Sequence, residues 1–151
     1  MENYHENLIH HASPACCVAN RMRGFPHTPP SLIPDGTYTT SITTEEQTSA
    51  GVSPTFACEN AGAFTLTVSG HRWDVVQSAA PGCTVLHPRW SGSWEIAGKE
   101  VAFRDDRSYG CTTTYSYNWT FDGTELRFTT IDDPCAQRVV IQTSHPWVMQ
   151  K

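Results

Sequence analysis

The stretch CTTTYSYNWTFDGTELRF, residues 111–128, decides the fold. It places an aromatic side chain at every second position and then reaches Asp122-Gly123, a dipeptide typical of a tight β-hairpin turn. Alternate side chains of a strand point to opposite faces, so the aromatic residues share one face and the Thr, Ser and Asn residues share the other. The segment therefore predicts a β-hairpin whose aromatic face turns towards a core; its aromatic positions are Tyr115, Tyr117, Trp119 and Phe121.

Two further tight turns, at Ser69-Gly70 and Ala97-Gly98, predict two more hairpins of the same kind. In each hairpin, one register gathers the large apolar side chains on one face. The expected cross-strand neighbours are Leu66 with Trp73, Phe64 with Val75, Trp94 with Val101, Gly92 with Phe103, Trp119 with Leu126 and Tyr117 with Phe128.

Two-residue alternation continues from residue 35 almost to the C-terminus and predicts antiparallel strands. The segment TTEEQTSAG, residues 43–51, instead predicts a short helix, because Thr caps it and acidic residues occupy its first turn. The expected strands are 36–43, 63–68, 71–77, 90–96, 99–104, 111–121, 124–130 and 136–143.

Short and long links alternate between these strands. In an up-and-down arrangement all the tight turns lie at one end and all the long links at the other, which is the shape of a cup. The predicted fold class is therefore all-β, an eight-stranded up-and-down antiparallel barrel with one short helix after the first strand. The competing β-sandwich needs at least one long link that crosses the sheet.

Residues 1–34 lack a sustained helix or strand period and predict a flexible or added N-terminal arm before a barrel domain at 35–148. His10, His11, Cys16 and Cys17 lie in this arm without the close spacing typical of zinc ligands, so no metal site is predicted. The arm also lacks a basic segment followed by an apolar core, so an exported protein would have lost its leader.

The overall charge limits the partners. A net charge of −5 and a pI near 5.7 argue against nucleic acids and anionic membranes, which bind basic surfaces. No apolar run is long enough to span a bilayer. The length of 151 residues fits one domain. A closed barrel has no free edge strand to pair through, so we expect a monomer.

Four cysteines fall in or beside the four long links: Cys58, Cys83, Cys111 and Cys135. Four cysteines allow three pairings, and adjacency of the links favours Cys58 with Cys83 and Cys111 with Cys135. Two disulfides would indicate an oxidising compartment, extracellular or periplasmic. The alternative is four free thiols in the cytosol; a zinc site is disfavoured because no two of these cysteines are closely spaced.

The order of these segments resembles the calycin superfamily, the lipocalins and their bacterial relatives. The residues that carry the resemblance are Gly36-Thr37-Tyr38 before a helix, ENAGAFTLTVSGHRW (59–73), SGSWEIAGKEVAF (91–103) and HPW (145–147). The last three also resemble a lipocalin-like domain found at the end of some bacterial substrate-binding proteins. Lipocalins carry Trp where this chain has Tyr38, with an Arg on or after the last strand stacked on that ring. Arg138 is the candidate, yet strand alternation predicts Val139 and Ile141 inside and Arg138 outside, which favours the broader calycin group.

The inward-facing residues of the predicted barrel form two groups, one at its closed end and one near its mouth. The closed end would be plugged by Tyr38, Leu66, Trp73, Trp94, Trp119 and Leu126. An aromatic-lined lumen near the mouth suits a small hydrophobic or amphipathic ligand, although side chains alone can also fill a barrel of this size. The candidate ligand-binding residues are Phe64, Val75, Trp90, Phe103, Tyr115, Tyr117, Phe128 and Trp147.

Two alternative functions remain open. The calycin resemblance implies that a cofactor-independent cyclase or isomerase could fold a flexible substrate in the lumen, with Tyr115 and Tyr117 as hydrogen-bond donors. No cofactor is expected, and the acidic residues near the mouth fall in links rather than as a pair in the lumen: Asp105, Asp106, Asp132 and Asp133. The second alternative is a protein-binding module that uses the loops at the mouth.

Overall fold

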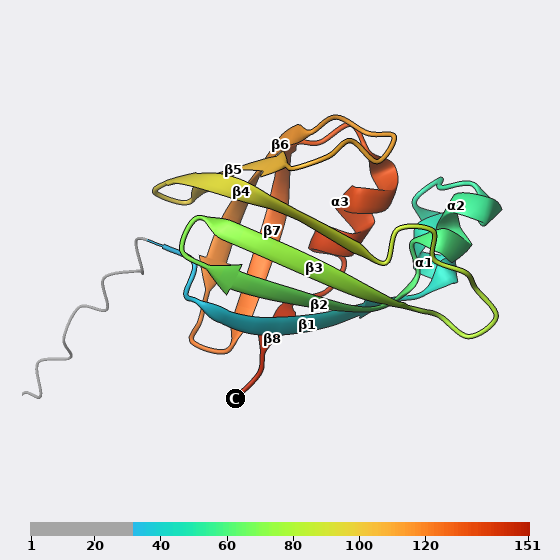
Figure 1. The fold of residues 1–151 in the computed structure, drawn as a ribbon, viewed down its shortest axis with the longest axis horizontal. Helices are drawn as coiled ribbons and strands as arrows, with labels where there is room; N and C mark the ends of the chain where they lie inside the picture. Colours follow the sequence, from blue (N-terminus) through green and yellow to red (C-terminus); the bar gives the residue numbers. More distant parts are fainter. Residues whose placement is uncertain (1–31) are drawn as a thin grey trace, which may run out of the picture.

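A computed structural model describes residues 32–151, and the predictions made for residues 1–31 lie outside that range. The chain forms a closed, antiparallel up-and-down barrel in which each strand pairs with its sequence neighbour and β8 pairs with β1 (Figure 1). The predicted fold class is confirmed. The strands are β1 (Gly36–Ile42), β2 (Gly62–Ser69), β3 (Arg72–Ala79), β4 (Arg89–Ala97), β5 (Glu100–Asp105), β6 (Thr114–Phe121), β7 (Glu125–Asp132) and β8 (Trp147–Met149).

The three predicted hairpins form, but their registers differ from the expected ones by two residues. The observed neighbours are Leu66 with Val75, Val68 with Trp73, Trp94 with Phe103, Ile96 with Val101, Trp119 with Phe128 and Phe121 with Leu126. The turns explain the shift, since Ser69 pairs with Arg72 and the turn falls on the two residues between them. A shift of two keeps every side chain on its predicted face.

The predicted strand at 136–143 is wrong, because these residues form helix α3 (Ala136–Thr143). The run of Val139, Val140 and Ile141 favours a strand locally. In the structure the chain crosses the barrel mouth here as a helix that buries Val140 and Ile141, and Val139 is only half-buried. The three residues of β8 then close the barrel by pairing with both β7 and β1.

Two further helices lie between β1 and β2. Helix α1 (Thr44–Ser49) is the predicted one, and Thr43 and Glu46 form a capping box at its start. Helix α2 (Pro54–Glu59) was not predicted, although Ser53 followed by proline is a usual helix start. Figure 1 shows α1 and α2 at the end of the barrel opposite the hairpin turns.

Side chains fill the barrel interior. The Phe103 ring stacks on Tyr115 at 5.1 Å between centroids, and it makes edge contacts with Trp73, Trp94 and Phe128. Gly92 makes room for this cluster, since a Cβ at that position would lie 2.4 Å from the Trp73 ring. The residues predicted to plug the closed end are all buried, and Ile33, which precedes the predicted domain boundary, joins the same core.

Both predicted disulfides are present, Cys58–Cys83 and Cys111–Cys135. The first ties α2 to the β3–β4 connection (residues 80–88). The second ties the β5–β6 connection (residues 106–113) to the residue that precedes α3. The two bonds thus hold together the segments that surround the barrel mouth. Between residues 32 and 151, no helix combines the length and the apolar character that crossing a bilayer requires.

Candidate functional site

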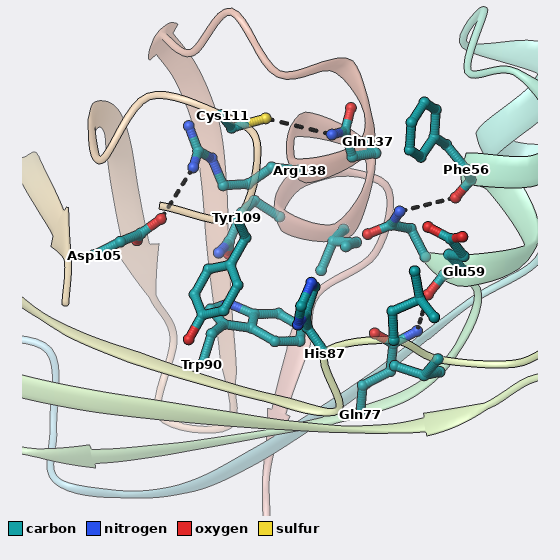
Figure 2. A pocket seen from close by; sticks show the side chains of 15 residues that line it. Phe56, Glu59, Gln77, His87, Trp90, Asp105, Tyr109, Cys111, Gln137 and Arg138 are labelled. Carbon is teal, nitrogen blue, oxygen red and sulfur yellow. Dashed lines mark hydrogen bonds and ion pairs between the residues drawn. The ribbon is translucent and has the colours of Figure 1, made fainter. Parts of the chain in front are cut away.

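A cavity of about 230 Å³ lies at the barrel mouth, between α2, α3 and the β3–β4 and β5–β6 connections. Figure 2 shows the rings of Trp90, Tyr109 and His87 gathered at its centre, with α2 on one side. The lining residues are Phe56, Glu59, Asn60, Gln77, Val85, Leu86, His87, Trp90, Asp105, Tyr109, Cys111, Gln137, Arg138, Ile141 and Gln142.

The apolar part of this lining is open rather than packed. Phe56 is 57% exposed and Leu86 is 62% exposed, although both are large apolar side chains. The His87 and Tyr109 rings lie 5.2 Å apart at a tilt, and Trp90 is half-buried beside them. Exposed apolar side chains grouped around a hollow are typical of a binding surface.

The mouth also holds a buried ionic network centred on Arg138, which the strand prediction had placed outside the barrel. That prediction is wrong because the residue belongs to α3. Its guanidinium lies 3.5 Å from the Tyr115 ring centroid and bonds two carboxylates, Asp133 at 2.7 Å and Asp105 at 3.2 Å. The resemblance to lipocalins implied stacking on Tyr38, whose hydroxyl instead donates to the Pro34 carbonyl. The buried arginine of this barrel therefore covers a different ring.

Tyr115 and Tyr117, the candidate donors, are part of the same network. The Tyr115 hydroxyl donates to Asp105 at 2.7 Å, and the Tyr117 hydroxyl donates to Asp133. Burial, followed by the nearby carboxylates, raises the pKa of both phenols far above the ordinary value. Their protons are therefore held inside the protein.

Burial also raises the pKa of Asp105, although the bond from Tyr115 and the charge of Arg138 oppose the shift. The sequence had placed Asp105 and Asp133 in separate links and suggested no carboxylate pair. The structure brings both onto one guanidinium, because the ends of β5 and β7 and the start of α3 meet at the mouth. The alternation of apolar and polar residues along the strands does not predict that Asp105 and Asp133 lie close together.

Among the eight candidate ligand-binding residues, Trp90 lines the cavity. The other seven are buried in the barrel core: Phe64, Val75, Phe103, Tyr115, Tyr117, Phe128 and Trp147. Phe56, Leu86 and Tyr109 line the cavity and were not among the candidates. The available signal was the presence of large apolar residues in links that are otherwise rich in turn residues.

Within the range that the structure describes, no three His, Cys, Asp or Glu side chains are grouped so that they could hold a metal ion. No family model matches the chain, and no match was found among the curated proteins or the solved structures. The closed barrel is the fold that a calycin resemblance implies.

Proposed function

We propose that this protein binds a small, uncharged, largely apolar molecule in the cavity at the barrel mouth. The observation that carries the proposal is the contrast between two sets of aromatic side chains. Those inside the barrel pack against one another, whereas Trp90, Tyr109 and His87 face an open cavity with Phe56 and Leu86 exposed at its edge. The proposed site is thus the mouth rather than the deep lumen.

The size and charge of the cavity support a small neutral ligand. Its volume of about 230 Å³ is below the ~300–1,000 Å³ of pockets that hold drug-sized molecules. Arg138 already pairs with Asp105 and Asp133, so its charge is balanced within the protein. An anionic ligand would have to compete with those carboxylates.

The geometry of the mouth gives less support to the two alternative functions. A cyclase was expected to use the hydroxyl protons of Tyr115 and Tyr117, and both protons are donated to aspartates of the protein. For a protein-binding module, the exposed apolar area is divided around a hollow rather than spread over a flat surface. We therefore propose ligand binding alone. The two disulfides support an oxidising location, extracellular or periplasmic.

Titration with methoxynaphthalene, a neutral bicyclic probe, tests the proposal. We expect saturable binding that weakens about two- to twelvefold in Phe56→Ser, because an aromatic contact contributes about 0.5–1.5 kcal/mol. Val76→Ser is the matched control, since Val76 is a 43% exposed apolar residue on β3 that does not line the cavity. Equal weakening in both variants, or the absence of saturable uptake of both this probe and its parent alcohol naphthol, would contradict the proposal.

A further inference from the structure

We infer that the ligand carries a hydrogen-bond donor, a hydroxyl or an N–H group, which Gln77 accepts at the polar side of the cavity. The inference rests on the proposed function and narrows the ligand to a neutral ring compound that bears such a donor. It follows from two buried glutamines in the cavity lining, Gln77 and Gln142.

Gln77, near the end of β3, has a fixed amide orientation. Its Nε2 donates to the Glu59 carbonyl at 2.9 Å and to the Ala61 carbonyl at 3.0 Å, which uses both of its protons. Figure 2 shows the first of these bonds as the dashed line between Gln77 and Glu59. A half-turn of the amide would lose both bonds, so the opposite end of the group is always the acceptor oxygen.

The Gln77 oxygen is open to a ligand. Within residues 32–151 this oxygen receives no hydrogen bond from the protein, yet it is not cut off from solvent. The side chain as a whole is only 6% exposed. Because Gln77 lines the cavity, an acceptor held rigidly at its wall selects molecules that can donate to it.

Gln142 of α3 supplies a second, independent sign of a missing partner. The residue is 5% exposed, and within residues 32–151 its buried Oε1 has no hydrogen-bond partner. An unpaired buried acceptor costs about 1–3 kcal/mol, and because this oxygen lies out of solvent contact, a ligand would reach the amide only after the side chain turns towards the cavity. Unlike the Gln77 amide, the Gln142 amide is not fixed through its oxygen by any bond within residues 32–151, so a half-turn lets either end of the amide face the cavity.

The charged residues around the cavity favour the binding of alcohols over carboxylic acids. Asp105 lines the cavity but is paired with Arg138, so Glu59 is the carboxylate that a ligand carboxylate would meet as a like charge. Such a ligand would also offer no proton to Gln77 at neutral pH. A neutral hydroxyl or N–H group meets neither difficulty. The geometry thus favours phenol-like or indole-like molecules over carboxylic acids of equal size.

Calorimetric titration with naphthol, its methyl ether methoxynaphthalene and naphthoate tests the inference. We expect naphthol to bind about five- to tenfold more tightly than the ether, the difference that one hydrogen bond makes, and naphthoate to bind more weakly than naphthol. Equal affinities for naphthol and the ether would overturn the inference and leave the proposed function standing. Failure of all three probes to bind would remove both.

Variants locate the effect. Gln77→Met removes the acceptor and should abolish the preference for naphthol while the affinity for the ether changes little. Gln150→Met makes the same substitution at an exposed position outside the cavity and should keep the preference. A Gln77→Met protein that still prefers naphthol would contradict the assignment. Should that variant fail to fold, the comparison of the three probes on the unmodified protein still decides the question.

Discussion

Arg138 links helix α3 to the ends of strands β5 and β7 at the barrel mouth. Its guanidinium binds Asp133 through two nitrogens, reaches Asp105 and the Thr112 carbonyl, and covers the Tyr115 ring. Bidentate pairing of a guanidinium with a carboxylate gives directional bonds, which suits a residue that must fix one element against others. The network therefore sets the position of α3 over the mouth, and with it the wall of the cavity.

The pH dependence of stability should carry the signature of Asp105. Folding raises its pKa, so the folded protein holds this proton more tightly than the unfolded chain does. The contribution is complete below the ordinary Asp pKa of about 3.9 and is lost as the pH rises through the raised value. The unfolding free energy of the wild type relative to Asp105→Asn should therefore fall as the pH rises from about 4 towards neutrality.

The measurement is urea unfolding of the wild type and Asp105→Asn at a series of pH values. Asp106→Asn is the matched control. Hydrogen bonds from Arg72 and Ser91 lower the pKa of Asp106, so its contribution has the opposite sign and is lost as the pH falls below about 4. A wild-type advantage over Asp105→Asn that grows with rising pH would contradict the account of Asp105.

At the scale of elements, α3 is where local preference and tertiary structure disagree. A run of β-branched residues favours a strand, yet the chain must cross the mouth between the end of β7 and the short β8. A helix satisfies its own backbone hydrogen bonds, so it can cross there without a neighbouring strand. The hairpins, by contrast, were predictable, because alternation and a turn dipeptide are both local signals. Their registers were not, since a turn displaced by one residue, such as Gly70-His71 in place of Ser69-Gly70, moves the pairing by two residues.

The two disulfides should contribute almost equally to stability. They join residues 25 and 24 positions apart, and the loop-closure model then gives about 3.5 kcal/mol for each. Denaturant unfolding of Cys58→Ser/Cys83→Ser and of Cys111→Ser/Cys135→Ser should show similar losses of unfolding free energy. A loss confined to one pair would show that contacts within the folded state, rather than loop entropy, dominate its contribution.

At the scale of the whole molecule, the barrel interior and the mouth have different tasks. The interior is a packed aromatic core, which alternation along the strands predicts well. The mouth is built from three helices and two connections, and its cavity depends on contacts between segments far apart in the sequence, such as Gln77 with Glu59 and Arg138 with Asp105. The two-residue alternation within a strand carries no information about contacts between such distant segments. The candidate residues taken from alternation therefore fell mostly in the core, with Trp90 at the boundary of both regions.

The most direct test of a binding site at the mouth is a map of backbone amide NMR shifts during titration with naphthol. We expect the largest changes in α2, in the β3–β4 and β5–β6 connections and in α3, which together surround the cavity. The hairpin turns at the opposite end of the barrel should remain unchanged. Saturable changes centred on those turns, or no saturable changes at all, would contradict a ligand site at the barrel mouth.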